Sequence, residues 1–239
     1  MTTENIIGDS KAIISNQDGI HDKLEEVVKK HISHEFKKPY QAHTKQAFTE
    51  VNEQVKAFLL ANENAEIILD ACCGVGQSTR ILAQQNPNAL VIGVDKSANR
   101  LDRNVEELTR LEGTEQVNNF VLVRADLNDF YRLVKAANWP VTKHYILYPN
   151  PWPKSKHLQR RWHGSAVFPQ MITIGQQLIL RSNWRLYLEE FQAALLLTGQ
   201  QSQLTAVVVA ENTQALTPFE AKYQASGQQC WQLQKNNYT

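Results

Sequence analysis

The part of this chain that most constrains its fold is residues 67–95, which read I-I-L-D-A-C-C-G-V-G-Q-S-T-R-I-L-A-Q-Q-N-P-N-A-L-V-I-G-V-D. An apolar strand leads into a glycine turn, a helix and a second strand that ends in an acid. Gly74 and Gly76 lack a Cβ atom where the backbone must turn sharply and approach a ligand, as at the first turn of doubly wound α/β folds. The segment therefore predicts a nucleoside-cofactor site, and with it an enzyme.

Strand and helix patterns alternate along the rest of the chain, as a parallel sheet with crossover helices requires. We expect an α/β fold: a seven-stranded, mostly parallel, doubly wound, Rossmann-like sheet with helices on both faces. Apolar side chains recur at helical spacing over residues 44–60, where a helix is expected. The expected strands are residues 66–69, 90–94, 120–125, 144–148, 177–181, 204–210 and 229–233. One domain, residues 41–239, is expected to follow a basic and partly flexible N-terminal extension, residues 1–40, whose first half is a loose arm.

The composition fits a soluble single-domain enzyme of 239 residues, 42% of them hydrophobic, with a formal net charge of +1. A chain of this length can bury a sizeable core. Three cysteines give neither a disulfide framework nor a zinc spacing, and His31-x-x-His34 has no matching third ligand, so we expect a reducing cytoplasm and no metal. The chain begins without a signal pattern, and no apolar run approaches the roughly 18 residues of a membrane span, so no membrane contact is expected.

Acids follow the first three expected strands. Asp70 opens the turn, and Asp95 follows about 20 residues after the turn in the sequence. At that position a carboxylate can accept hydrogen bonds from both ribose hydroxyls of a nucleoside. The order Asp70-x-x-x-Gly74-x-Gly76 resembles the S-adenosylmethionine (SAM) loop of class I methyltransferases. This resemblance implies that Asp126 meets the adenine amino group, although a strand-end Asp can equally cap the next helix. The predicted SAM site comprises Asp70, Cys72, Gly74, Gly76, Asp95, Lys96, Asp126 and Leu127.

A proline-rich loop follows the fourth expected strand, and residues 145–164 read Y-I-L-Y-P-N-P-W-P-K-S-K-H-L-Q-R-R-W-H-G. Pro149, Pro151 and Pro153 fix three φ angles, so the loop is stiff and can hold side chains against a flat substrate. It resembles the P-D-P-W-P-K-K-x-H-x-x-R-R signature of bacterial tRNA (guanine-N7)-methyltransferases. Residues 175–187 resemble that family's G-G-x-L-x-L-A-T-D-W-x-x-Y segment, and residues 217–227 resemble its T-x-F-E-x-K/R motif and later glycine.

Two amides stand where the family has acids, at Asn150 and Asn183. The resemblance implies that those carboxylates hold the guanine edge and balance the cation that forms when N7 is methylated. An amide gives less charge stabilisation, but it can also pair with adenine, as in the N-P-P-Y/W loops of amino-group methyltransferases. Both asparagines could instead be turn residues.

A run of cations follows the proline loop on a nearly neutral chain, which favours contact with phosphates over a merely solvated face. Trp152 and Trp162 flank it and could stack on bases or simply pack. A second basic stretch, from Lys29 to His43, could contact RNA from the N-terminal side. The predicted RNA-binding residues are Trp152, Lys156, His157, Arg160 and Arg161.

We therefore expect a cytoplasmic SAM-dependent methyltransferase that acts on N7 of guanine in tRNA. The resemblance implies that Asn150, Lys154 and Asn183 line the pocket and that Thr217 and Glu220 close it. The alternatives are methylation of another base, a small molecule or a protein, or a weakened relative that binds RNA or SAM without turnover. The sequence leaves open whether the protein is a monomer or a homodimer.

Overall fold

A seven-stranded sheet in the order β3-β2-β1-β4-β5-β7-β6 forms the centre of the computed structural model, which describes residues 10–103, 117–208 and 214–237. β1 to β5 pair in parallel, whereas β7 runs antiparallel to both of its neighbours. The predicted mostly parallel, doubly wound sheet is therefore confirmed. The strands are β1 (Glu66–Ala71), β2 (Ala89–Asp95), β3 (Phe120–Arg124), β4 (Val141–Leu147), β5 (Gln177–Ser182), β6 (Gln203–Ala206) and β7 (Trp231–Asn236).

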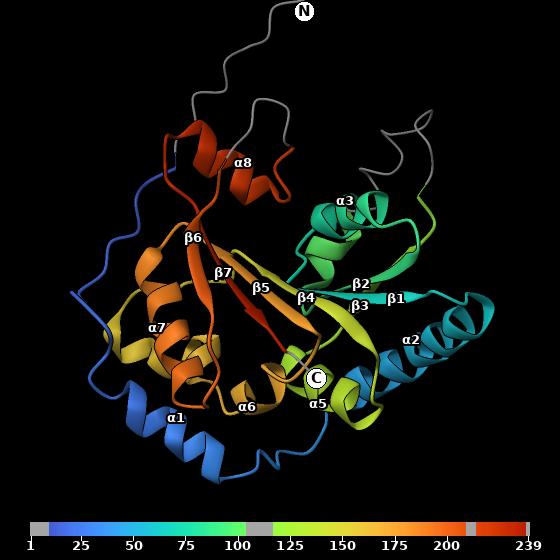
Figure 1. Ribbon diagram of the computed structural model, residues 1–239, viewed down its shortest axis with the longest axis horizontal. Coiled ribbons are helices and arrows are strands. Elements are labelled where there is room, and N and C mark those ends of the chain that lie inside the picture. Colours follow the sequence, from blue (N-terminus) through green and yellow to red (C-terminus); the bar gives the residue numbers. More distant parts are fainter. Residues whose placement is uncertain (1–9, 104–116, 209–213, 238–239) are drawn as a thin grey trace, which may run out of the picture.

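Helices cover both faces of the sheet (Figure 1). On one side lie α3 (Gln77–Gln85), which packs against β2 and β3, and α8 (Pro218–Ala225). The other side carries α2 (Ala42–Ala61), α5 (Leu127–Ala136), α6 (Phe168–Met171) and α7 (Arg185–Leu196), and α1 (Leu24–Ser33) packs over α6 and α7. Two 3₁₀ helices, η1 (Ser155–Arg160) and η2 (Trp162–Gly164), follow the proline-rich loop.

Burial explains which helical patterns form. The helix predicted over residues 44–60 is α2, whose side chains Phe48, Val51 and Val55 are buried against the sheet side of the core. The helix α1 was not predicted. Its buried residues Leu24 and Val27 stand three positions apart, which is the helical spacing of apolar residues over a single turn. The predicted N-terminal extension thus includes a packed helix.

The strand bounds agree with those expected to within two residues in β1, β2, β3 and β5, and differ more in β4, β6 and β7. β4 begins at Val141, earlier than predicted. The prediction missed its first residues because the polar Thr142 and Lys143 interrupt the apolar pattern of the strand. β6 ends at Ala206, and residues 209 and 210 of the expected strand lie outside the described residues. β7 is shifted toward the C-terminus because it pairs with β5 from Trp231 to Asn236, although most of its residues are polar.

The chain changes direction across the sheet between β1 and β4. From β1 it proceeds outward through β2 to β3, then returns to the other side of β1 to form β4. Ligands of open α/β sheets bind at such a switch point, outside the carboxyl ends of the strands. Across the described residues, every helix is too short or too polar to cross a bilayer.

Candidate functional site

The glycine turn after β1 contains three residues with a left-handed backbone: Cys72 at φ 64°, Gly74 at φ 61° and Gly76 at φ 76°. Gly76 caps α3, and a Cβ atom added to Gly74 would meet nothing within 4 Å. Gly74 is therefore required by its backbone conformation, and the space beside it is open. Burial raises the pKa of the Cys72 thiol to about 12.

Asp70 holds the first turn of α3 against the end of β1. Its Oδ2 atom accepts hydrogen bonds from Ser78 Oγ at 2.6 Å and Thr79 Oγ1 at 2.7 Å, while Oδ1 is buried without a partner among the described residues. Burial raises the pKa of Asp70 to about 6, against the two hydroxyl hydrogen bonds, and the nearby Asp95 raises it further. The unpaired oxygen is thus a buried acceptor beneath the glycine turn.

Thr79 stands where the dinucleotide fingerprint has its third glycine, which lets the helix approach the strand. In this chain the glycine that allows the helix and the sheet to approach is Gly93, on the neighbouring strand β2. A Cβ atom on Gly93 would lie 2.3 Å from Thr79 Oγ1. Gly93 was not predicted as a site residue. A glycine inside an apolar strand was the available signal.

Asp95 ends β2 and anchors the turn from the opposite side. Its carboxylate accepts from Gly74 N at 3.2 Å, from Ser97 N at 2.8 Å and from the Arg100 guanidinium at 3.3 Å. A carboxylate offers about four acceptor positions, so about one remains with these contacts intact. Acceptance of both ribose hydroxyls would thus require one of the present donors, most simply the exposed Arg100, to move. Lys96, also predicted at the cofactor, is exposed.

Asp126 follows β3 and caps α5, with its Oδ1 atom 2.9 Å from Asn128 N. Its Oδ2 atom accepts from Gln41 Nε2 at 3.2 Å. The capping alternative therefore describes what Asp126 does in the structure, and its adenine contact stays a prediction. Leu127, its neighbour, is buried in the core.

The proline loop leaves the end of β4 at the same edge of the sheet. Tyr148 and Trp152 adopt left-handed backbone conformations, at φ 50° and φ 46°, and Tyr148 N donates to Arg181 O of β5 at 2.9 Å. Asn150 lies between them and is exposed, and its Oδ1 atom accepts from Trp152 N at 3.2 Å. Asn183 follows the end of the adjacent β5. The structure thus brings both amides to neighbouring strand ends.

Backbone groups determine which atom of each amide remains open. Trp152 N can only donate, so it engages the oxygen of Asn150 and leaves Nδ2 open. Ser10 O can only accept, so it binds Gln228 Nε2 at 2.8 Å, and Gln228 Oε1 then accepts from Asn183 Nδ2 at 2.9 Å. Within the described residues, Asn150 therefore offers a donor and Asn183 an acceptor.

The cations after the loop divide into an exposed and a buried group. Lys154, Lys156 and Arg160 are exposed, and the Arg160 guanidinium lies 4.7 Å from the Trp152 ring centroid. Trp152 and His157 are half-buried and in edge contact, with ring centroids 5.4 Å apart. Arg161 is 0% exposed, so its predicted contact with RNA phosphate is wrong. Its guanidinium instead donates to Trp152 O and Lys154 O, at 3.1 Å and 3.4 Å.

Glu190 of α7 is the anion that pairs with Arg161, and it is also 0% exposed. It accepts hydrogen bonds from His163 Nε2 at 3.0 Å, from Gln17 Nε2 and from His21 N at 2.9 Å. Burial alone would raise the pKa of Glu190, but these partners and Arg161 together lower it from 4.5 to about 2. Glu190 was not predicted as a functional residue, although an acid on the apolar side of a helix pattern, between Leu188 and Phe191, was an available signal.

Thr217 and Glu220 lie at the start of α8. Thr217 caps the helix by accepting from Glu220 N at 3.0 Å, and the Glu220 carboxylate accepts from Arg181 Nη1 at 2.9 Å and 3.2 Å. Both side chains are buried. They join α8 to the end of β5, and their predicted role in closing the pocket remains a prediction.

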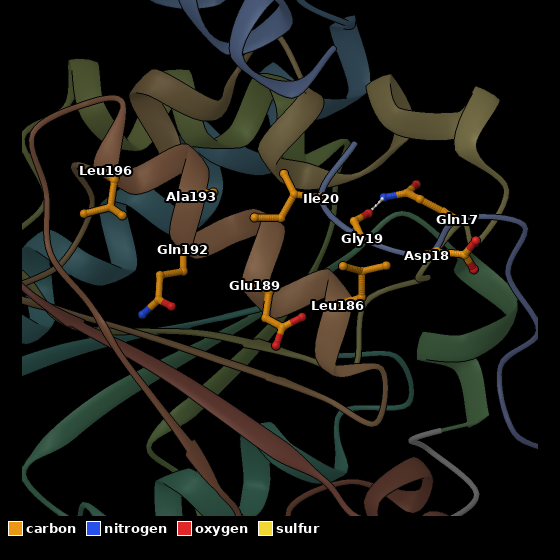
Figure 2. A pocket seen from close by; sticks show the side chains of 9 residues that line it. All are labelled: Gln17, Asp18, Gly19, Ile20, Leu186, Glu189, Gln192, Ala193 and Leu196. Carbon is orange, nitrogen blue, oxygen red and sulfur yellow. Dashed lines mark hydrogen bonds between the residues drawn. The ribbon is translucent and has the colours of Figure 1, made fainter. Parts of the chain in front are cut away.

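A separate cavity of about 530 Å³ lies between α7 and the N-terminal segment (Figure 2). Its lining includes Gln17, Ile20 and Leu196 but none of the residues predicted at the SAM or substrate site. We therefore assign the candidate site to the strand ends and the loops that join them. In the described part of the chain, no group of three or more His, Cys, Asp or Glu side chains could hold a metal ion.

Comparison with known proteins gives one family match and several relatives. The profile of the family described as "Putative methyltransferase" matches residues 64–233. A tRNA (guanine-N(7)-)-methyltransferase of Treponema pallidum is 26% identical over 71% of this chain and 66% of its own length. A ribosomal RNA small subunit methyltransferase B of Pasteurella multocida is 46% identical over 26% of this chain and 14% of its own. The match spans less than half the length of most of the curated relatives.

Among solved structures, the 16S rRNA (adenine(1408)-N(1))-methyltransferase of Catenulisporales acidiphilia, crystallised with SAM, has a similar fold. Its TM-score is 0.56, with 15% sequence identity over 78% of this chain and 91% of that one. The similarity supports the Rossmann-like fold of a SAM methyltransferase.

The buried pair predicts unequal roles for two adjacent arginines. Arg161→Met leaves Glu190 as a buried charge without its cation, and we expect a loss of about 3–5 kcal/mol in the free energy of unfolding. Arg160→Met removes only an exposed contact with Trp152, worth about 0.5–1 kcal/mol. Urea denaturation at pH 7 measures both.

The pH dependence provides a second measurement of the same pair. Because the pKa of Glu190 is lowered from 4.5 to about 2, its stabilisation is complete above pH 4.5 and is lost as the pH falls toward 2. This acid-dependent loss should shrink in Arg161→Met. Equal stabilities of the two arginine variants would contradict a structural role for Arg161.

Proposed function

Because the chain belongs to the methyltransferase family whose profile matches residues 64–233, we propose that it transfers the methyl group of SAM to RNA, at N7 of guanine in tRNA. The observation that carries this proposal is the position of the glycine turn after β1 and the proline loop after β4. Both stand at the carboxyl edge of the sheet, on either side of its switch point. We propose a reducing cytoplasm as the setting, since Cys72, Cys73 and Cys230 are free thiols.

The residues of the glycine turn fit SAM. The open space beside Gly74 admits a ligand close to the backbone, and the unpaired Oδ1 atom of Asp70 is an acceptor that lies buried behind the turn. Asp95 would hold the ribose through its remaining acceptor position, and Asp126 would lie near the adenine. When bound, SAM supplies the activated methyl group.

The two amides fit a guanine that needs positioning rather than proton removal. Guanine N7 already has its lone pair, so the pocket has only to align this atom with the methyl group. The open Nδ2 atom of Asn150 can donate to guanine O6, and the open Oδ1 atom of Asn183 can accept from the guanine amino group. Lys154, next to this loop, would face the RNA backbone.

The exposed cations extend this pocket toward RNA. Lys154, Lys156 and Arg160 stand on or beside η1, directly after the loop, and Trp152 lies among them as a surface for base stacking. Arg161 has no part in this surface. The experiment that tests the function is incubation of the protein with methyl-labelled SAM and total RNA, followed by identification of the labelled nucleoside. Label in 7-methylguanosine of tRNA is expected, and label in another nucleoside or none would contradict the proposal.

A variant of the ribose carboxylate tests the cofactor site. Asp95→Ala removes the acceptor for a ribose hydroxyl and the anchor of Gly74 N, and we expect SAM affinity to fall by about tenfold to a hundredfold, or about 1–3 kcal/mol. Arg100→Met is the matched control, since it removes a competing donor and should leave affinity unchanged or higher. Calorimetric titration measures both. Equal affinities of Asp95→Ala and the wild type would remove Asp95 from the site.

The salt dependence of RNA binding tests the exposed cations. Replacing Lys154, Lys156 and Arg160 by Ala should weaken tRNA binding and reduce the log–log salt slope by about 0.7–0.9 for each phosphate that the variant no longer neutralises. SAM affinity should stay unchanged. The control replaces Lys45, Lys56 and Lys135, exposed cations of α2 and α5, by Ala. An unaltered salt slope in the first variant would show that these cations contact solvent and not RNA phosphates.

The amide donor of Asn150 predicts how the rate responds to a restored acid. Asn150→Asp keeps the acceptor for Trp152 N but replaces the Nδ2 donor to guanine O6 with a carboxylate oxygen, so the rate on tRNA should fall by about fivefold to a hundredfold, or about 1–3 kcal/mol. Asn150→Ala, which keeps neither group, should lower it. Single-turnover assays at saturating SAM measure these rates. A rise with Asn150→Asp would contradict the role of the amide donor and would favour a charge near the cation that develops on guanine.

A further inference from the structure

The family profile begins at residue 64, yet residues far upstream of it lie against the candidate substrate site. Residues 10–21, here named the strap, contain no helix and run from the neighbourhood of α8 to α1 (Figure 1). Ser10 N donates to Ser226 Oγ at 3.1 Å, and Ser10 O accepts from Gln228, the residue that orients Asn183. One end of the strap is thus joined to the segment between α8 and β7.

The middle of the strap contacts the proline loop itself. Ser15 Oγ donates to Pro153 O at 2.6 Å. Asn16 forms two hydrogen bonds with Ser155, accepting from its backbone N at 3.0 Å and donating to its Oγ at 3.3 Å. These contacts hold the loop directly beside Lys154, at the point where it enters η1.

The other end of the strap reaches the buried ion pair. Gln17 donates to Glu190 and accepts from Arg161 Nη1 at 3.1 Å, and His21 N donates to Glu190 at 2.9 Å. Arg161 in turn donates to the carbonyl oxygens of Trp152 and Lys154. The loop is therefore held from two sides, by Arg161 from inside and by the strap from outside.

We propose that the strap is part of the substrate site, and that Ser15, Asn16 and Gln17 are positioning residues that keep the proline loop in its RNA-binding conformation. The kinetic consequence rests on the proposed RNA methylation, whereas the effect on loop conformation does not. When only a fraction of molecules has the competent loop, the apparent affinity for RNA falls by that fraction. Loosening the strap should thus raise KM for RNA more than it lowers kcat.

The test uses the full-length chain with paired substitutions. Ser15→Ala with Asn16→Ala removes the three hydrogen bonds to the loop, while Ser15→Thr with Asn16→Asp keeps a hydroxyl donor and the acceptor for Ser155 N. We expect the alanine pair to raise KM for tRNA about tenfold, with kcat and SAM affinity within about twofold of the wild type. The conservative pair should restore KM. Val55→Ala, on the buried face of α2, controls for a general loss of stability.

Amide hydrogen exchange of residues 152–161, followed by mass spectrometry, tests the strap without reference to activity. Exchange there should become about tenfold faster in the alanine pair and stay near the wild-type rate in the conservative pair and in Val55→Ala. Unchanged exchange and KM in the alanine pair would overturn the proposal, as would equal changes in Val55→Ala. If the wild-type protein methylates no RNA, the proposed function fails, while faster loop exchange in the alanine pair alone still supports the strap.

Discussion

The substrate side of this protein depends on one buried ion pair, between Arg161 and Glu190. Burying two charges is costly unless each also satisfies its remaining hydrogen-bonding positions. Here those positions are filled from three parts of the chain: the strap, the proline loop and η2. Because either charge would be costly to bury with only some of these partners, the three segments and α7 must adopt their positions together. The pair thereby turns a loop that three prolines make stiff into one that is also fixed in place.

The cofactor side has a different physical basis. Asp70, the two hydroxyls of α3 and the small residue Gly93 bring strand and helix close together within a stretch of the chain that is continuous in sequence. Its contacts are local: the unpaired carboxylate oxygen of Asp70 is buried, and the space beside Gly74 is open. The two sides meet only because β1 and β4 are adjacent in the sheet.

The amides at Asn150 and Asn183 show how a change from acid to amide can be directed by its surroundings. An isolated amide offers both a donor and an acceptor, but here the backbone N of Trp152 engages the oxygen of Asn150, and the Gln228 side chain, oriented by Ser10 O, engages the nitrogen of Asn183. The candidate site therefore keeps a donor at one strand end and an acceptor at the next. In the proposed function, these two groups would recognise a base edge by the direction of their hydrogen bonds and not by charge.

The sequence by itself determined the features that depend on local pattern. Apolar periodicity located seven strands and α2, glycine and acid spacing located the cofactor turn, and the proline loop identified the family. Tertiary structure alone decided which polar groups face a ligand and which are consumed by the fold. Arg160 and Arg161 are neighbours of the same type, yet one is exposed and the other buried, because only the second meets Glu190. The strap was unpredictable for the same reason: its contacts join residues more than a hundred positions apart, and such pairings leave no periodicity in the sequence.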